Sequence, residues 1–333
     1  MTEVDRSALK SFHFRHLDPL LFLGTASDRY AGWLGQIYSK ERYFGRINRR
    51  KKRVGGKHFV EAVLPVESVE EYFQHFRILE LDFTFYSTLL GEKGIPTNSF
   101  RTLETYRHHL KKDDRLLVKA PQLFFARKIR SGKEYLANEQ YLDGRAFMES
   151  FYNPLCDLLD PWIDGIIFEQ EYQRKDERIS LQDFAHALNG FFGFLPREDR
   201  FHVELRTQYY LAKPVLSVLE QHGVGQVFSH WTWLPPLRQQ FARGGKKFSN
   251  GGGSTIVRLM TPRGMRYEDA YARAYPFDSL IPDMMSQDMI PQTVEIMQEA
   301  LNQGVRINVI INNRSGGNAP LIARELARQF LEG

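Results

Sequence analysis

"FHVELR", residues 201–206, alternates apolar and polar side chains from its first position to its last. The odd-numbered positions are apolar, and the even-numbered positions are His202, Glu204 and Arg206. Because successive side chains of a β-strand point to opposite faces, this segment has one apolar face and one charged face. In a closed barrel the apolar face packs against the surrounding helices, and the other face lines the interior. The segment therefore predicts a barrel strand with a polar inner face.

Eight strand-like segments are distributed along the chain, and helical patterns separate most of them. The strand candidates are Leu21–Ser27, Ile78–Tyr86, Arg115–Pro121, Gly165–Gln170, Phe201–Thr207, Val224–His230, Thr255–Met260 and Arg306–Asn312. Apolar residues recur at helical spacing in Val66–Phe76, Arg145–Leu159, Leu181–Phe192, Pro214–His222 and Pro291–Asn302. Strands that alternate with helices indicate a parallel sheet, and eight strands close a (β/α)8 barrel. We therefore expect an α/β fold, a TIM-barrel-like closed parallel barrel that residues 1–333 form as a single domain.

The composition of the 333 residues is ordinary for a globular protein, with 42% hydrophobic and 26% charged residues. The single cysteine, Cys156, excludes an internal disulfide and is typical of a reducing compartment, so a cytoplasmic location is expected. The start of the chain, Met1–Lys10, lacks the apolar core of a signal peptide. No apolar segment reaches the roughly 20 residues of a membrane-spanning helix, so no membrane partner is expected. The sequence carries no signal for the oligomeric state.

One segment after the first predicted strand is strongly basic. Between positions 42 and 57 it holds no acidic residue and eight cations, namely Arg42, Arg46, Arg49, Arg50, Lys51, Lys52, Arg53 and Lys57. Residues 42–58 are predicted to be an insertion that either contacts phosphate groups or is solvated and mobile. A second segment, residues 244–254, is rich in glycine and is predicted to be a flexible loop.

The inner faces of the predicted strands carry charges of both signs. The expected interior set is Glu80, Asp82, Glu169, Glu204, Lys119, Arg206 and Arg258, with Thr84 and Tyr86 on the second strand and Asn308, Ile310 and Asn312 on the last. Since an unpaired buried charge costs several kcal/mol, these groups are expected to pair with one another. Such a network either fixes the packing of the barrel or forms part of a ligand site at the carboxyl ends of the strands, where barrel enzymes place their chemistry.

Glu169, Glu204 and His230 end three successive predicted strands and are candidate ligands for a divalent metal. The cations expected in the same interior oppose this interpretation, and no HExxH or paired CxxC motif supports it. No cofactor is therefore predicted, and a divalent metal remains the alternative.

Six short motifs follow one another at the predicted strand ends. They are LGTASDRYAGW (23–33), LELDFTFY (79–86), LLVKAP (116–121), HVELR (202–206), TIVRLM (255–260) and INNRSGGNAP (311–320). Their order and spacing resemble those of the DUF72 (YecE-like) family of bacterial and archaeal proteins. The matching positions are Gly24, Thr25, Tyr30, Trp33, Glu80, Thr84, Phe85, Tyr86, Lys119, Glu204, Arg206, Arg258, Asn312, Asn313, Gly317 and Ala319. The resemblance implies a TIM-barrel-like fold and no particular reaction, because the family is functionally uncharacterised.

The chain departs from the family pattern at several positions. Asp28 stands where the family has an early tryptophan, and Asp82 where it has an asparagine. "EQEY", residues 169–172, lacks the two prolines of the family's Gln-x-Pro-Pro segment. The histidine that follows Arg258 in the family is missing, so no catalytic role of that histidine can be transferred. The chain thus resembles a divergent member.

The first functional hypothesis is an enzyme, a hydrolase or a lyase, that acts on an anionic or phosphate-containing ligand at the C-terminal mouth of the barrel. The candidate catalytic residues are Glu204, Lys119, Glu80 and Arg206, with Glu204 and Lys119 as the acid–base groups. The candidate ligand-binding residues are Arg258, Asn312, Asn313, Gly316, Gly317, Asn318, Tyr86 and Thr25. Gly316, Gly317 and Asn318 would offer backbone N–H groups to a phosphate ahead of the last helix, and Asn313 would hold the loop together.

Two further hypotheses belong to other functional classes. The basic segment, with nearby aromatic residues, favours a nucleic-acid-binding protein or a nuclease. A barrel whose charged interior is purely structural favours a non-catalytic scaffold or sensor.

Overall fold

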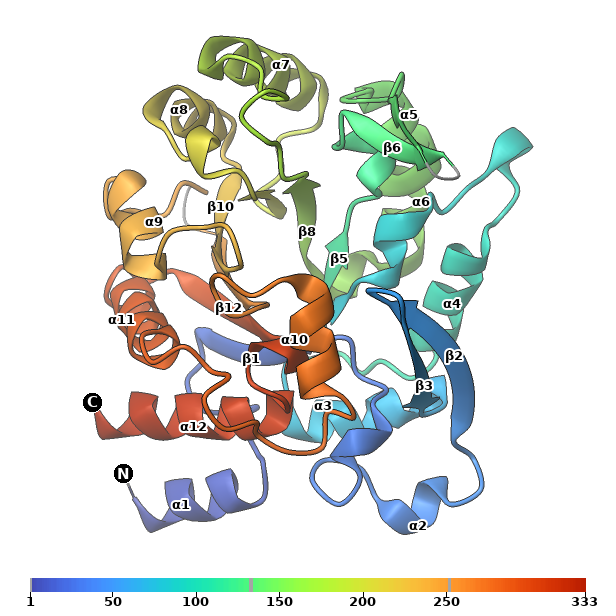
Figure 1. The fold of residues 1–333 in the computed structure, drawn as a ribbon, viewed down its shortest axis with the longest axis vertical. Helices are drawn as coiled ribbons and strands as arrows, with labels where there is room; N and C mark the ends of the chain where they lie inside the picture. Colours follow the sequence, from blue (N-terminus) through green and yellow to red (C-terminus); the bar gives the residue numbers. More distant parts are fainter. Residues whose placement is uncertain (1, 132–133, 251–252) are drawn as a thin grey trace.

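The computed structural model describes residues 2–131, 134–250 and 253–333 and shows a closed barrel of eight strands (Figure 1). Around the barrel the strands follow the order β1, β12, β11, β10, β9, β8, β5, β4. Their bounds are β1 Leu21–Ala26, β4 Ile78–Leu81, β5 Arg115–Lys119, β8 Ile163–Gln170, β9 Phe201–Leu205, β10 Gly225–His230, β11 Ser254–Leu259 and β12 Arg306–Ile311. All neighbouring pairs are parallel. The predicted TIM-barrel-like fold is confirmed.

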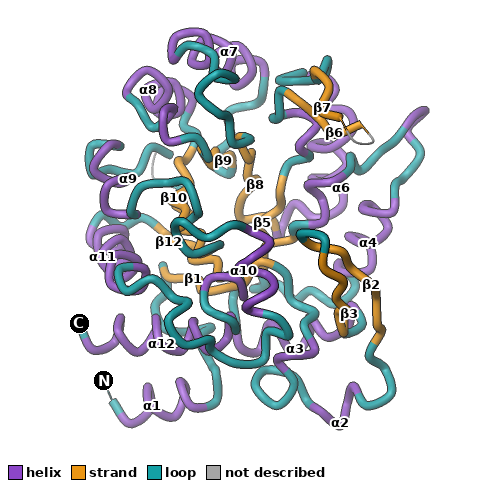
Figure 2. Tube along the Cα trace, viewed as in Figure 1, coloured by secondary structure: helices purple, strands orange, loops and turns teal. Residues whose placement is uncertain are grey.

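Helices surround the barrel and occupy most of the connections between its strands (Figure 2). Their bounds are α1 Glu3–Lys10, α2 Lys40–Tyr43, α3 Val69–His75, α4 Asn98–Arg107, α5 Gly144–Phe147, α6 Asn153–Leu159, α7 Leu181–Phe194, α8 Lys213–His222, α9 Leu237–Arg243, α10 Tyr267–Ala274, α11 Met289–Asn302 and α12 Ala319–Glu332. A π-helical turn, Met148–Tyr152, joins α5 to α6 within the segment predicted as one helix. None of the described helices combines the length and the apolar character needed to cross a membrane.

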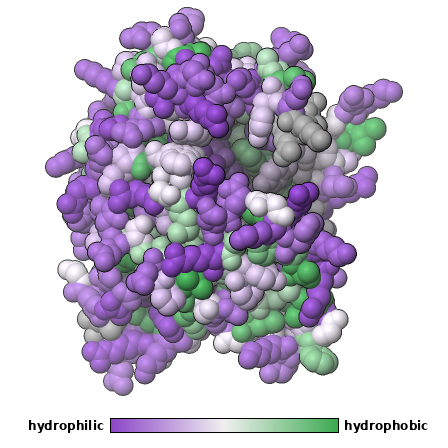
Figure 3. All heavy atoms as spheres, viewed as in Figure 1, coloured by the Kyte–Doolittle hydropathy of each residue, from purple (hydrophilic) through white to green (hydrophobic). Residues whose placement is uncertain are grey.

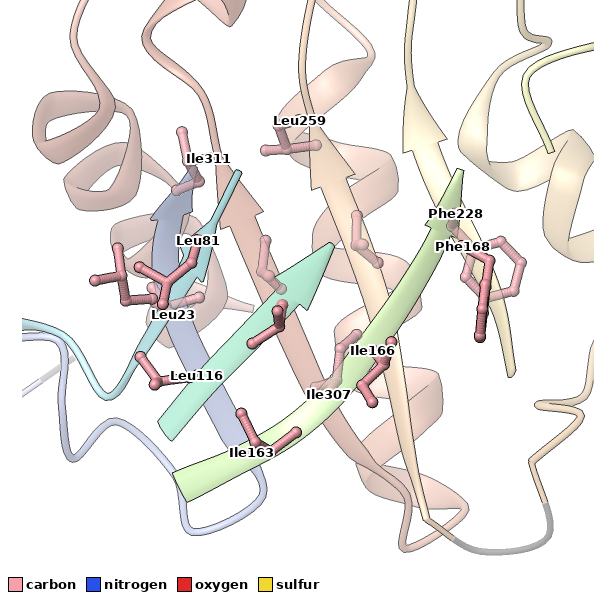
Figure 4. Close-up of a cluster of buried hydrophobic side chains, with 14 of the residues drawn as sticks. Leu23, Leu81, Leu116, Ile163, Ile166, Phe168, Phe228, Leu259, Ile307 and Ile311 are labelled. Atoms are coloured by element: carbon pink, nitrogen blue, oxygen red, sulfur yellow. The ribbon is translucent and has the colours of Figure 1, made fainter. Parts of the chain in front are cut away.

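The core has two layers, one on each side of the strands. The outer layer lies between strands and helices, and Figure 4 shows part of it, including Leu23, Leu81 and Leu259. The inner layer is a smaller apolar cluster within the barrel, to which Phe22 and Ile310 belong.

The second predicted strand ends earlier than expected. β4 stops at Leu81, and Phe83–Tyr86 forms a turn of 3-10 helix. The hydroxyl of Thr84 donates hydrogen bonds to the carbonyl oxygens of Leu81 (3.2 Å) and Lys119 (2.7 Å), which draws the chain across the end of β5. The prediction that Thr84 and Tyr86 point into the barrel from a strand was therefore wrong, and Tyr86 is 73% exposed.

The basic segment forms an ordered antiparallel hairpin, which was not predicted. Strands β2 (Asn48–Val54) and β3 (Lys57–Val63) pair along their whole length, and Gly55 and Gly56 form the turn with positive φ angles of 54° and 81°. Glycine adopts these angles without steric cost. Strands β6 (Lys128–Ser131) and β7 (Glu134–Ala137) also pair in antiparallel orientation. Within the loop predicted at 244–254, residues 251 and 252 lie outside the described residues, and β11 begins at Ser254.

Gly24 leaves no room for a side chain between β1 and β4, and its replacement tests the closure of the barrel. A Cβ at this position would lie 2.0 Å from the carbonyl oxygen of Ile78 on the adjacent strand. We expect Gly24→Ala to lower the free energy of unfolding by about 1–3 kcal/mol, measured by urea denaturation. Gly190→Ala in α7 is the matched control, because nothing lies within 4 Å of the added methyl group. The control should stabilise the helix by about 0.5–1 kcal/mol; equal effects of the two variants would contradict the prediction.

Candidate ligand site at the barrel mouth

Six charged side chains meet at the C-terminal end of the barrel interior and form the predicted ionic network. They are the carboxylates Glu80, Glu169 and Glu204 and the cations Lys119, Arg206 and Arg258. They come from β4, β5, β8, β9 and β11 and from the residue that follows β9. The charges balance, three against three, so the network can be buried without a net charge.

Arg258 is the centre of this network and is 1% exposed. Its Nε and Nη2 atoms donate to the two carboxylate oxygens of Glu80 at 2.8 and 2.7 Å, and its Nη1 donates to Glu204. Such a bidentate pair fixes both side chains in position. The two Glu80 oxygens are thus already engaged by the protein itself.

Glu169 connects the other two cations. Its carboxylate lies 2.5 Å from Nζ of Lys119 and 2.7 Å from Nη1 of Arg206. Burial alone would raise the pKa of Glu169, but the cations around it hold that pKa well below its usual range. The Lys119 ammonium also lies 3.9 Å from the centre of the Phe85 ring, which shields it from solvent. Glu169 therefore stays ionised and paired at neutral pH.

Asp82 does not belong to the network, contrary to the sequence-based prediction. Its carboxylate accepts a hydrogen bond from the Ser27 hydroxyl at 2.9 Å. Asp82 follows the end of β4 and has a helical backbone conformation, because the chain turns there into the 3-10 helix. Its side chain consequently lines a cavity beside the network and not the barrel interior.

The candidate metal ligands Glu169, Glu204 and His230 do not come together. His230 lies on the face of β10 that carries Phe228, which packs against Phe241 in the helical layer, whereas the two glutamates lie in the interior. Among the described residues no group of three or more His, Cys, Asp or Glu side chains could hold a metal ion. Burial lowers the pKa of His230 to about 4, so it is neutral at pH 7. The prediction of this ligand set was wrong because the alternation of side chains along β10 points His230 away from the barrel interior.

The Gly316–Asn318 loop does not offer its N–H groups to the barrel mouth, as the phosphate prediction required. The N–H groups of Gly316 and Gly317 both donate to the carbonyl oxygen of Asn313, at 3.3 and 2.6 Å. The loop is buried beneath the segment 277–281, and Asn318 donates to the carbonyl oxygen of Phe277 at 2.8 Å while it caps α12. The helix N-terminus is therefore saturated by the protein, and the phosphate site is not at this position.

The two asparagines and Thr25 hold loops together. Asn313 accepts hydrogen bonds from the indole of Trp33 (3.1 Å) and from the N–H of Ala319 (2.8 Å), as expected for a residue that stabilises the loop. Asn312 accepts from the N–H of Arg314 at 3.0 Å. The Thr25 hydroxyl donates to the carbonyl oxygen of Ser27 at 2.7 Å and is fully buried. These contacts account for the local geometry of the motifs at the ends of β1 and β12.

A cavity of about 670 Å³ opens beside the network, between the hairpin β2–β3 and the ends of β1 and β4. Its walls include Asp28 and Arg29 after β1, Lys51 of the hairpin, Tyr86 after β4 and Phe277. Of the six network residues, only Glu80 lines it. This cavity adjoins the C-terminal ends of barrel strands β1 and β4, the usual position of a ligand site in this fold.

Asp28 is the most perturbed carboxyl group of this cavity. It is 2% exposed; the hydroxyl of Tyr106 donates to its Oδ1 at 2.8 Å, and its Oδ2 has no hydrogen-bond partner among the described residues. Burial raises the pKa of Asp28 to about 6, against the opposing effect of the neighbouring Arg29. A carboxyl group with such a pKa can hold or release a proton near neutral pH.

The cavity also contains cations that have no carboxylate partner. Arg50 and Lys52 form ion pairs with Glu61 at 2.8 Å, but among the described residues no ion pair involves Arg29 or Lys51. Arg29 is half-buried and Lys51 is exposed. An anion in the cavity would therefore find two positive charges that the protein has not neutralised.

The model of the family described as "Protein of unknown function DUF72" matches residues 48–332. The chain belongs to the DUF72 family. Two solved structures support the same assignment of fold. A DUF72 family protein of Thermotoga maritima is 15% identical, with a TM-score of 0.57 over 94% of this chain and 100% of that one. A DUF72 family protein of Enterococcus faecalis is 14% identical, with a TM-score of 0.54 over 94% of this chain and 96% of that one. No curated protein matches this chain.

In this DUF72 barrel the motif residues and the cavity residues are largely different sets. The motif residues Glu80, Lys119, Glu204, Arg206 and Arg258 form the ionic network. The cavity instead presents Asp28, at the position where the DUF72 pattern has a tryptophan. Sequence reasoning missed Asp28 as a functional candidate, although an acidic residue in place of an aromatic one, directly after a barrel strand, was a signal that could have identified it.

Proposed function

We propose that this DUF72 protein is an acid–base enzyme that acts on an anionic ligand bound in the cavity beside the ionic network. The observation that carries this proposal is Asp28, a buried carboxyl group with a raised pKa and an unpartnered oxygen in the wall of a cavity. Leaving one oxygen of a buried carboxyl group without a partner costs the protein stability, which is typical of residues retained for chemistry.

Arg29 and Lys51 supply the recognition of the anion in this proposal. Both line the cavity, and neither is paired with a carboxylate among the described residues. A bound anion adds negative charge next to Asp28 and raises its pKa further above 6. Ligand binding thus favours the protonated form of Asp28, which can donate its proton to a leaving group as a general acid.

The ionic network forms the floor of the site in this account and positions its walls. Glu80 lies between the two regions, since Arg258 holds its carboxylate while its side chain lines the cavity. Lys119 and Glu204, first considered as acid–base groups, are occupied by their partners in the network. We therefore assign proton transfer to Asp28, with Asp82 as a second carboxylate in the same cavity.

Turnover of chromogenic phosphate monoesters and diesters, measured against pH, tests this proposal. If Asp28 is the acid, kcat/KM should fall as pH rises above about 6, because the group then loses its proton. Asp28→Asn should lower kcat/KM by about 10²–10⁴-fold and remove this inflection. Arg29→Gln should mainly raise KM. Lys112→Gln, an exposed residue at the opposite end of the barrel, is the control and should change neither value.

Two outcomes would count against the assignment. If Asp28→Asn keeps the rate and the pH profile of the natural protein, Asp28 is not the acid. If inorganic phosphate binds in a manner that requires Arg29 but no ester is turned over, the protein is a binding or sensor barrel, and the catalytic part of the proposal is rejected.

A further inference from the structure

The basic hairpin has two chemically different faces. On the inner face Arg50 and Lys52 pair with Glu61, and Val54 packs against Tyr271. The outer face of β2 carries the alternate residues Arg49, Lys51 and Arg53, and all three are exposed. Among the described residues none of these three takes part in an ion pair, whereas Arg42 and Arg46 pair with glutamates around α3. The hairpin therefore separates neutralised cations from free ones.

The free cations form a row along β2. Alternate residues of a strand are about 7 Å apart, so the outer face presents charges at a spacing comparable with that of successive phosphates in an extended nucleic-acid strand. His58 lies opposite Arg53 in the hairpin and Val60 lies opposite Lys51, so no acidic side chain interrupts the row. Hydrophilic side chains cover most of the face of the molecule on which the hairpin lies (Figure 3).

Exposed aromatic rings gather on the loops at the C-terminal ends of the barrel strands. Each of the following is at least 39% exposed: Tyr86, Tyr172, Tyr209, Trp233 and Tyr267. They follow β4, β8, β9, β10 and β11, so five of the eight loops at this end of the barrel contribute one. The ring centroids of Tyr172 and Trp233 are 5.8 Å apart and the ring planes are tilted by 33°, and the Arg314 guanidinium lies 4.5 Å from the centre of the Tyr267 ring.

From these two features we infer that the barrel mouth and the outer face of the hairpin together bind a single-stranded nucleic acid. The row of Arg49, Lys51 and Arg53 contacts its phosphates, and the aromatic rings of the mouth stack on its bases. The inference rests on the proposed function in one respect, because a strand held in this way delivers an anionic group to the cavity that Lys51 and Tyr86 line.

The combination of features selects a single strand over other ligands. In a duplex the bases stack on one another, so the exposed rings would have no partner. A neutral polysaccharide could stack on the rings but would gain nothing from the free cations. A simple polyanion would use the cations but not the rings. Only a single-stranded nucleic acid has both a charged backbone and accessible π-faces along its length.

Fluorescence anisotropy with a labelled oligothymidylate and an oligouridylate of about 15 nucleotides tests the inference on the full chain. The triple variant Arg49→Gln, Lys51→Gln, Arg53→Gln should weaken binding at least tenfold. Between about 50 and about 200 mM salt, it should also flatten the plot of log affinity against log salt by about 2, since each phosphate contact on a single strand contributes about 0.7. The control triple variant Lys10→Gln, Lys111→Gln, Lys112→Gln removes the same charge from exposed sites away from the hairpin and should bind as the natural protein does.

A second set of variants tests the aromatic residues of the site. Tyr172→Ala and Trp233→Ala should each weaken binding about tenfold and leave the salt slope unchanged, because stacking releases no counterions. Three results would overturn the inference: no binding at low salt, equal losses in the hairpin and control triples, or duplex DNA or polyphosphate bound as tightly as the single strand. Asp28→Asn should not weaken strand binding, because it removes a negative charge beside the bound phosphate. If the natural protein binds no single strand but Asp28→Asn still abolishes ester turnover, the proposed function stands and the nucleic-acid inference is rejected.

Discussion

Glu80→Gln is expected to lower the free energy of unfolding by about 3–5 kcal/mol. The substitution preserves the shape of the side chain and removes one charge from a buried network of three carboxylates and three cations. Arg258, at 1% exposure, then loses its bidentate carboxylate and keeps the Glu204 contact, so the buried network carries a net positive charge. Urea denaturation at pH 7 measures the change.

Two further variants test whether the loss of stability in Glu80→Gln comes from the unbalanced buried charge. Glu295→Gln breaks an exposed arginine–glutamate pair, with Arg238, and should cost at most about 1 kcal/mol. The double variant Glu80→Gln, Arg258→Met restores the charge balance of the network and should be more stable than Glu80→Gln alone. If Glu80→Gln cost no more than the exposed control, the buried charge balance would not stabilise the fold.

Asp28→Asn is expected to stabilise the protein above neutral pH by up to about 3 kcal/mol. The pKa of Asp28 is about 6 in the folded protein and about 3.9 in an unfolded chain. Between these values the folded protein retains a proton that the unfolded chain releases, so stability falls as pH rises through this range and stays low above it. Two pKa units correspond to about 3 kcal/mol. Asparagine carries no charge and avoids this loss.

The measurement is the difference in unfolding free energy between Asp28→Asn and the natural protein at several pH values. At about pH 4 Asp28 is largely protonated in the folded chain and partly in the unfolded one, so the difference should be small. It should grow toward pH 6 and then remain constant. Together with the expected loss of turnover, a gain in stability would identify Asp28 as a residue kept at a cost to the fold. A difference that does not vary with pH would contradict the raised pKa.

The sequence predicted the barrel and the six partners of the network because both depend on local patterns. The alternation in residues 201–206 fixes which side chains face inward, and the same argument holds for Lys119, Glu169 and Arg258 on their own strands. Asp82 was misplaced because the alternation was extended beyond the end of β4. His230 was misplaced because a position at a strand end does not state which face the side chain takes.

The hairpin and the cavity could not be predicted in the same way. Gly55 and Gly56 are typical of a two-residue hairpin turn, and the segment after them alternates as a strand does. The many basic residues before the turn concealed this hairpin signal. Which cations are free depends on Glu61, which pairs with Arg50 and Lys52 across the hairpin. A run of basic residues in the sequence shows neither which carboxylate each cation pairs with nor which face of the hairpin each side chain takes.

The sequence by itself determined the closed parallel barrel, its DUF72 motifs and the charged character of its interior, because the period of each strand sorts the side chains locally. Only the tertiary structure decided the site. In the folded chain the N–H groups of Gly316 and Gly317 donate to the carbonyl oxygen of Asn313. Arg258 pairs with Glu80, which lies 178 positions away in the sequence. The tertiary structure also buried Asp28 against Tyr106, 78 positions along the chain. Burial and pairing of a charge depend on residues that are distant in the chain, and these two properties set the chemistry of the cavity.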